Sequence, residues 1–339
     1  MKPILSKPQI KDYILNSISL EKQLLLSIDI DKTLVDRKKS SHDFPKYIGE
    51  ELSELIKNKH IVVFSNSGRD FDAVKPVQKN ITGLENMIML NGRAVKRNGN
   101  TTVKEAGIIP DSIKNRIWEL FINDEIPFLD IKRSEGTLFI VKEKASVLNA
   151  LGAQKPADWY PDGLPQIINM KEDNNAKDIY DEIRVLRFEV PFKDKNLVNI
   201  INEENNEKLY SELINKVIES TEKIEIELVC SESKNTEFVN TLGFVRISVN
   251  DTVVNKGLAL KEIAEELVIP ENNVFHIGDS SGEKADDTVI KVVMPKSNFV
   301  VVGNADDEAK RLADVILKPV NEDGIFEFIQ CLNEILEGR

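Results

Sequence analysis

Short apolar runs recur near both ends of the chain, separated by segments with helical periodicity. Such runs suit strands that are buried on both faces, as in a parallel sheet, because these strands have no side that faces solvent. The predicted strands are residues 24–31, 61–64, 87–90, 274–277 and 299–302. The predicted helices are residues 44–57, 256–267 and 325–336, with a helical N-terminal extension within residues 1–22. This order predicts an α/β fold with a parallel sheet covered by helices.

The segment between these two groups of runs follows a different pattern. It mixes predicted helices and strands, at residues 111–123, 137–141, 185–190 and 207–220. A chain of 339 residues is also longer than one hydrophobic core usually serves. We therefore expect an α/β core domain made of residues 1–108 and 245–339, interrupted by an inserted α+β domain at residues 109–244.

The charge balance excludes some classes of partner. The chain has 45 Lys and Arg against 57 Asp and Glu, a net charge of −12, whereas binding to nucleic acid needs a clustered basic surface. No apolar run approaches the roughly 20 residues that span a bilayer, and residues 1–20 lack the apolar centre of a signal peptide. We expect a cytoplasmic protein, a monomer or homodimer, with no nucleic-acid or membrane partner.

Two aspartates lie at the end of the first apolar run. Open α/β sheets bind ligands at the carboxyl ends of their strands, and residues two apart on a strand point to the same side. Asp29 and Asp31 would therefore bring two carboxylates together, which repel each other unless a cation or a shared proton compensates. Mg²⁺ suits this position, because it prefers carboxylate, water and phosphate oxygens. The alternative is a helix-capping aspartate followed by an aspartate in a loop.

Four strings resemble, in the same order, the motifs of the haloacid dehalogenase (HAD) superfamily. They are Asp29-Ile30-Asp31-Lys32-Thr33-Leu34, Ser67-Gly68-Arg69, Lys256-Gly257-Leu258-Ala259-Leu260 and Gly278-Asp279. The string Asn91-Gly92 after the third predicted strand is similar to the Cof-type branch of that superfamily. The resemblance implies a Rossmann-like core with a type IIB cap, an α+β insertion that governs the choice of substrate.

The resemblance also implies a role for each motif residue. Asp29 would be the nucleophile, Asp31 the general acid and base, and Lys256 a fixed positive charge. The residues expected to bind phosphate or substrate are Ser67, Gly68, Arg69, Asn91 and Lys256. The groups expected at the Mg²⁺ are the carboxylates of Asp29 and Asp279 and the backbone carbonyl of Asp31, with Asp287 and Asp286 as further acids.

Two of these assignments have alternatives. Ser67 keeps the family's spacing to Gly-Arg, which favours it over Ser65. In the fourth motif, either Glu283 or the pair Asp286-Asp287 supplies the second acid, and the longer spacing resembles the loops of phosphomannomutase and sucrose phosphatase. We favour the pair, because a short aspartate beside a metal demands less displacement of the backbone than a glutamate.

Three other polar residues have a structural and a functional interpretation. His276 lies inside an apolar strand, which favours a core histidine over a ligand. Arg69 either forms a structural ion pair or contacts the substrate. Arg187, in a predicted strand of the insertion, either pairs with a neighbouring acid or binds a second anionic group of the substrate.

The leading hypothesis is a Mg²⁺-dependent phosphatase. It would hydrolyse a small phosphorylated sugar or sugar conjugate through an aspartyl-phosphate intermediate. One alternative is a phosphomannomutase-like phosphomutase, suggested by the length of the fourth-motif loop. The other is a non-catalytic binding protein that uses the HAD scaffold.

Overall fold

The chain divides into two compact units, each described by itself below. The computed structural model describes residues 2–40, 42–124, 126, 128–142, 165–191, 224–229, 244–249, 253–280 and 287–338. The first unit comprises Met1–Arg69, Ala73–Lys104 and Val254–Arg339, and the second comprises Asp70–Asp72 and Glu105–Val253. The second unit extends beyond the expected residues 109–244 at both ends. At the C-terminal end the reason is a strand, β11 (Phe244–Val249), which pairs with other strands of the second unit.

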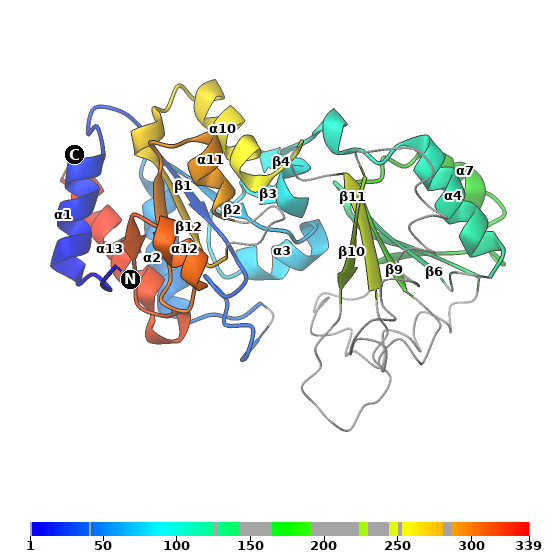
Figure 1. Ribbon diagram of the computed structural model, residues 1–339, viewed down its shortest axis with the longest axis horizontal. Helices are drawn as coiled ribbons and strands as arrows, with labels where there is room; N and C mark the ends of the chain where they lie inside the picture. Colours follow the sequence, from blue (N-terminus) through cyan, green and yellow to red (C-terminus); the bar gives the residue numbers. More distant parts are fainter. Residues whose placement is uncertain are drawn as a thin grey trace. The chain divides into compact units, whose positions relative to one another are not determined.

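The first unit contains a sheet of eight strands among its described residues, in the order β14-β13-β12-β1-β2-β3-β4-β5 (Figure 1). Their bounds are β1 Leu24–Ile28, β2 Ile61–Asn66, β3 Met87–Met89, β4 Ala94–Arg97, β5 Asn100–Val103, β12 Val274–Gly278, β13 Asn298–Val301 and β14 Val315–Ile316. The neighbours from β14 to β3 are parallel, and β4 and β5 add antiparallel edge strands. The predicted α/β fold with a parallel sheet is therefore confirmed.

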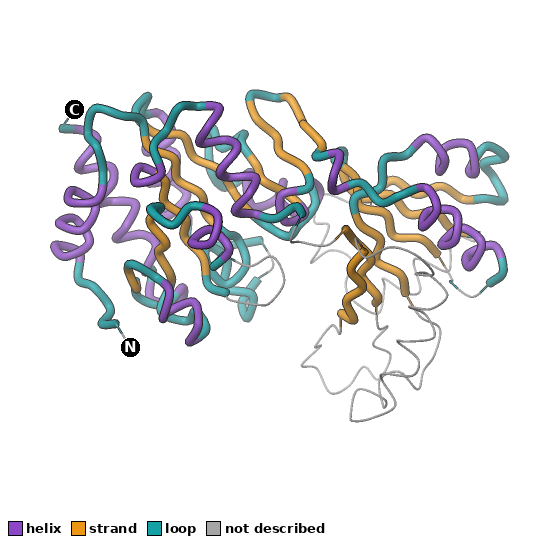
Figure 2. Tube along the Cα trace, turned by 45° about the horizontal axis from the view of Figure 1, so that its top comes forward, coloured by secondary structure: helices purple, strands orange, loops and turns teal. Residues whose placement is uncertain are grey.

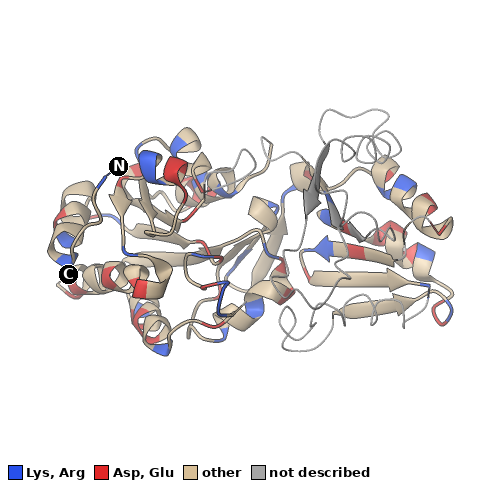
Figure 3. Cartoon of the chain, turned by 60° about the horizontal axis from the view of Figure 1, so that its bottom comes forward, with Lys and Arg blue, Asp and Glu red and all other residues tan. Residues whose placement is uncertain are grey.

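The central strands of this sheet carry no charged side chain. Strands β1, β12 and β13 are buried along their whole length, and Figure 3 shows them without Lys, Arg, Asp or Glu. A strand covered on both faces cannot hydrate a charge, so charged residues begin only where a strand ends. Asp29 and Asp279 directly follow β1 and β12, at the carboxyl edge of the sheet.

Helices cover both faces of this sheet. Their bounds are α1 Lys7–Ser17, α2 Lys46–Lys57, α3 Phe71–Gln78, α10 Lys256–Glu266, α11 Val289–Val293, α12 Asp307–Leu312 and α13 Gly324–Glu337. Buried residues of α10 and α11 share one apolar cluster with Leu25 and Val274. The next residue of β12, Phe275, points the other way and packs edge-on against Phe328 of α13, with ring centroids 5.7 Å apart. Helix α13 also packs against α1 and α2, so helices near the two ends of the chain lie side by side (Figures 1 and 2).

The second unit contains a six-stranded sheet among its described residues, in the order β10-β11-β9-β6-β7-β8. The remaining bounds are β6 Phe128–Arg133, β7 Gly136–Val141, β8 Gln166–Asn169, β9 Arg187–Pro191 and β10 Ile224–Val229. All neighbours are antiparallel except β7 and β8. Helices α4 (Asp111–Ile122) and α7 (Ala176–Glu182) contribute Trp118 and Tyr180 to an apolar cluster on one face. The predicted helix at residues 207–220 lies outside the described residues.

Short 3₁₀ helices complete the described elements. They are η1 Leu90–Gly92, η2 Glu105–Gly107, η3 Glu271–Asn273 and η4 Val320–Glu322. Within the described ranges, no helix combines the length and the apolar character needed to cross a membrane.

Replacing Phe328 by Ala should lower the free energy of unfolding by about 3–5 kcal/mol, because the ring is fully buried against the sheet and its loss leaves a cavity. Val292→Ala is the control, since Val292 is 77% exposed. Urea unfolding followed by circular dichroism measures both. Equal losses in the two variants would show that α13 does not depend on this contact.

Candidate active site

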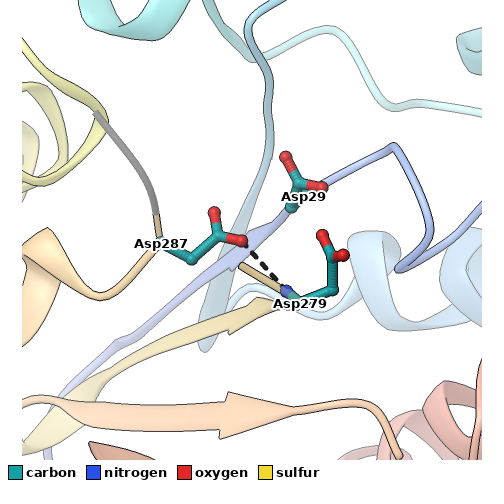
Figure 4. Close-up of side chains that lie close together, drawn as sticks. All are labelled: Asp29, Asp279 and Asp287. Carbon is teal, nitrogen blue, oxygen red and sulfur yellow. Dashed lines mark hydrogen bonds between the residues drawn. The ribbon is translucent and has the colours of Figure 1, made fainter. Parts of the chain in front are cut away.

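Three carboxylates meet at the carboxyl edge of the first sheet. Strands β1 and β12 are parallel neighbours with Ile28 opposite Ile277, so Asp29 and Asp279 emerge from adjacent strands. Asp287 joins them just before α11, and one carboxylate oxygen of each residue lies within 4.8 Å of the others (Figure 4). All three residues are buried, at 7% exposure or less.

Lys256 supplies the positive charge of this cluster from the first turn of α10. Asn255 caps the helix by accepting a hydrogen bond from the Leu258 amide at 2.8 Å. The Lys256 Nζ donates to Asp29 Oδ1 at 2.7 Å and to Asp287 Oδ1 at 2.9 Å. Burial alone would lower the pKa of Lys256, but the charges of Asp287 and Asp29 outweigh it and raise the pKa. The side chain is therefore a permanent cation held against Asp29.

The cluster carries more negative than positive charge. Burial raises the pKa of Asp29 well above its usual value, Lys256 opposes this, and Asp287 and Asp279 raise it further. Three carboxylates and one ammonium therefore favour a further cation. Closely spaced carboxylate oxygens are hard ligands, which fit Mg²⁺. The residues present thus suit the divalent ion that the sequence predicts.

Asp287 is held by donors on both of its oxygens. Oδ1 contacts Lys256 and His276, and Oδ2 accepts hydrogen bonds from the backbone amides of Asp279 at 3.0 Å and Ser280 at 3.2 Å. Burial opposes ionisation, yet Lys256 and the hydrogen bond from His276 lower the pKa of Asp287. A carboxylate has about four acceptor positions, and these four donors occupy them. Asp287 is therefore better suited to holding its neighbours in place than to binding a metal directly.

A glycine makes this position of Asp287 possible. A Cβ on Gly278 would lie 2.3 Å from the Asp287 carboxylate, closer than atoms can pack. The fourth motif thus contributes Gly278, Asp279 and Asp287 to one site. The other candidates for its second acid, Asp286 and Glu283, lie outside the described residues.

Asp31 is bound by two arginines. Arg69 forms a bidentate pair with it, from Nε to Oδ2 at 3.0 Å and from Nη2 to Oδ1 at 2.6 Å. Arg37 adds a contact from Nη1 to Oδ1 at 2.8 Å. Burial would raise the pKa of Asp31, but Arg69 and then Arg37 lower it to about 2. The ion-pair interpretation of Arg69 therefore holds in this structure. Arg37 was not predicted, because it belongs to no motif string.

The second motif lies next to the turn after β3. Ser67 directly follows β2, and its Oγ accepts a hydrogen bond from the Arg69 amide at 3.2 Å. Asn91 has a left-handed backbone conformation, with φ 56°, and its backbone amide donates a hydrogen bond to the Ser67 carbonyl at 3.2 Å. Its side chain lies beside Gly68, where a Cβ would approach Asn91 Oδ1 to 2.8 Å. The substrate-binding roles of these residues remain predictions.

The two candidate serines of this motif differ in position. Ser65 lies within β2, and its hydroxyl donates to the Asn86 carbonyl at 3.5 Å. Ser67 lies at the strand end, where parallel sheets place their ligand sites. The geometry therefore favours Ser67.

The second unit has a polar sheet face opposite its apolar cluster. Figure 3 shows charged positions within strands β6 and β9. Arg187 pairs with Glu189 at 3.2 Å, and Lys132 pairs with Asp130 at 2.9 Å. Burial would raise the pKa of Glu189, but Lys132 and Arg187 lower it to about 2. Arg187 thus takes the ion pair that was one of its two expected roles.

The fold and the site are those of an α/β enzyme with an acidic centre at the carboxyl edge of its sheet. The family model of haloacid dehalogenase-like hydrolases matches residues 26–329. The chain therefore belongs to this family, and the predicted family and the predicted hydrolase class are both confirmed.

Relatives of known structure share this fold. A hypothetical protein from Geobacillus kaustophilus superimposes with a TM-score of 0.62 and 19% identity, over 92% of this chain and 99% of that chain. A HAD subclass IIB sugar phosphatase superimposes with a TM-score of 0.58 and 15% identity, over 91% of this chain and 98% of that chain. A HAD-superfamily phosphatase from Bacteroides thetaiotaomicron superimposes with a TM-score of 0.57 and 15% identity, over 93% of this chain and 96% of that chain.

One relative is known from its sequence. A protein from Geobacillus stearothermophilus, described as an uncharacterized protein in the pdhA 5′ region, is 31% identical over 81 residues. These residues are 24% of this chain and 79% of that protein.

Gly92→Ala should destabilise the protein more than Gly99→Ala, although both glycines have positive φ, 90° and 79°. A Cβ at Gly92 would lie 2.3 Å from the Asn255 carbonyl, whereas nothing lies within 4 Å of one at Gly99. Both variants bear the backbone strain of about 1–2 kcal/mol. Gly92→Ala should lose a further ~1–3 kcal/mol by overpacking. Urea unfolding measures the difference, and equal losses would contradict the close approach of this turn to α10.

Proposed function

We propose that the protein is a Mg²⁺-dependent phosphatase that hydrolyses a small phosphorylated sugar or sugar conjugate. The observation that carries the proposal is the buried contact between Lys256 and Asp29, inside a cluster of three aspartates. Transfer of a dianionic phosphoryl group needs a nucleophile, a fixed cation and hard ligands for a metal, and this cluster supplies all three. The sugar phosphatase among the fold neighbours supports the substrate class.

The reaction would proceed in two displacements at phosphorus. First, an oxygen of Asp29 attacks phosphorus, the bond to the substrate oxygen breaks, and that oxygen takes a proton from Asp31. The product alcohol leaves, and Asp29 carries an acyl phosphate. Then water attacks phosphorus while Asp31 takes its proton, and the bond to Asp29 breaks to release inorganic phosphate. A Mg²⁺ held by Asp29 and Asp279 would offset the repulsion between nucleophile and substrate.

Asp31 must change partners during this cycle. With its pKa lowered to about 2 by Arg69 and Arg37, Asp31 is ionised and cannot donate a proton. The substrate phosphate is an anion that can take the same bidentate position on Arg69. Binding of the phosphate would then release Asp31 from one arginine and favour its protonation. Arg69 in this proposal serves as an ion-pair partner first and a phosphate ligand second.

The second unit would act as the cap that selects the substrate. Its sheet presents buried charged side chains, among them Arg187 and Lys132, on the face opposite its apolar cluster. These side chains are polar groups held in place by ion pairs, which suits recognition of a hydroxyl-rich molecule. We therefore assign the choice of sugar to this unit and the chemistry to the first unit.

Phosphate release should be Mg²⁺-dependent and concentrated on one member of a panel of sugar phosphates and phosphoglycerate conjugates. The assay compares Mg²⁺ with EDTA and measures free phosphate. An isomerised product without free phosphate would indicate a phosphomutase instead. No turnover of any member would contradict the phosphatase and favour a binding protein.

Asp29→Asn should reduce phosphate release by roughly 1,000-fold or more, because the amide cannot attack phosphorus. Asp36→Asn is the matched control, since Asp36 lies in the loop after β1 but pairs with Lys39 rather than with the cluster. The variants are compared on the best substrate of the panel, with circular dichroism to confirm folding. Turnover by Asp29→Asn close to that of the control would exclude Asp29 as the nucleophile.

A further inference from the structure

A histidine lies directly behind the acidic cluster, where no motif places a functional residue. His276 is in the middle of β12 and only 1% exposed. Its Nδ1 lies 3.0 Å from Ser27 Oγ, and its Nε2 lies 3.0 Å from Asp287 Oδ1. The ring stacks on Phe299 with an interplanar angle of 9°. Both nitrogens are thus engaged, and the ring has one orientation.

The partners of His276 determine which of its nitrogens must carry a hydrogen. Asp287 is held as a carboxylate, whose oxygens only accept, so His276 donates from Nε2 to Asp287 Oδ1. On the other side of the ring, the Ser27 hydroxyl pairs with His276 Nδ1 and accepts a hydrogen bond from Asn66 Nδ2 at 3.0 Å. The contact that holds Asp287 therefore needs a hydrogen on Nε2.

The oxygen that accepts from His276 also accepts from Lys256. Asp287 Oδ1 is this oxygen, and Asp287 Oδ2 accepts from the amide of Asp279. Through Asp287, the position of His276 therefore bears on the cation beside Asp29 and on the backbone of Asp279.

The register of the sheet produces this arrangement. Ser27 lies opposite His276 in the parallel ladder between β1 and β12. Asn66 is the last residue of β2, on the other side of β1. Three adjacent strands thus each contribute one buried polar side chain to this series.

We propose that His276 is a positioning residue that holds Asp287, and through it Lys256 and Asp279, in the geometry that binds a divalent cation. The contacts of the ring with Ser27 and Phe299 fix the orientation that this requires. The inference rests on the proposed cation site, but not on the identity of the substrate. A core histidine with no such role would affect stability and leave cation affinity unchanged.

Two substitutions separate these roles. In His276→Gln, the amide nitrogen is as many bonds from Cα as His276 Nε2, so it can still donate to Asp287. In His276→Asn, the amide reaches only as far as Nδ1, so it keeps the contact with Ser27 and loses Asp287. Both replace the ring by a smaller polar side chain, which makes them a matched pair.

The first experiment measures Mn²⁺ binding by the full chain, using electron paramagnetic resonance without substrate. Outer-sphere substitutions typically weaken metal binding 10–100-fold, so we expect about that loss for His276→Asn and less than about threefold for His276→Gln. Circular dichroism confirms that each variant is folded. A folded His276→Asn variant with parental Mn²⁺ affinity would overturn the proposal.

A second measurement uses proteins that keep His276, so it does not depend on how the His276 variants fold. Nitrogen NMR of ¹⁵N-histidine-labelled protein reports which ring nitrogen carries a proton. The chain has three histidines, so His42→Gln and His60→Gln assign the remaining signal. We expect a hydrogen on Nε2 of His276, and an Nε2 that carries no hydrogen would overturn the proposal. Neither measurement needs turnover, so an inactive protein with these two properties would refute the phosphatase and leave His276 in its role.

Discussion

The buried ammonium of Lys256 is the interaction on which the site depends. It contacts Asp29 and Asp287 at 2.7 and 2.9 Å, in a region where all three side chains are at most 8% exposed. Breaking a buried ion pair by removing one partner typically costs about 3–5 kcal/mol, because an uncompensated charge remains. Lys256 is thus the ammonium that offsets the charges of both Asp29 and Asp287. The lysine therefore allows the protein to keep concentrated negative charge at the edge of an apolar sheet.

The fold brings these groups together by means of strand order. The chain visits β1 first and β12 only after the whole second unit, yet the two strands are neighbours with a one-to-one register. Residues separated by about 250 positions therefore end at the same edge. Two glycines then permit close approaches that a side chain would block. Gly278 lets Asp287 lie against β12, and Gly92 lets the turn after β3 lie against Asn255. The site results from tight backbone contacts as much as from charged residues.

The carboxylates of Asp31 and Asp287 are held in two different ways, the first by a pair of arginines and the second by a histidine. Arg69 and Arg37 hold Asp31 ionised at the rim, where another anion can compete for them. His276 holds Asp287 from inside the sheet, where the ring is almost fully buried and stacked on Phe299. The proposed chemistry needs both, because the proton donor must change state while the acid that anchors Lys256 must not.

Much of the fold followed from the sequence pattern. Apolar runs predicted β1, β2, β3, β12 and β13, since a strand buried on both faces needs apolar residues throughout. Helical periodicity predicted α2, α10 and α13. The short edge strands β4 and β5 were not predicted, because three of four β5 residues are exposed and the pattern of burial is lost there. The C-terminal boundary of the second unit was placed too early, because only pairing with β9 and β10 assigns β11 to that sheet.

The sequence by itself determined which residues are candidates for the site, most of them at strand ends. It could do so because motif spacing and the exclusion of charge from buried strands are local properties. It identified Asp29, Asp31, Ser67, Lys256 and Asp279 as candidates and Asp287 as one of several acids. Only the tertiary structure decided that both oxygens of Asp287 are held, that Arg37 joins Arg69 at Asp31, and that His276 donates toward the site. These are contacts between strands and loops far apart in the chain, and the register and burial that create them exist only once the sheet has formed.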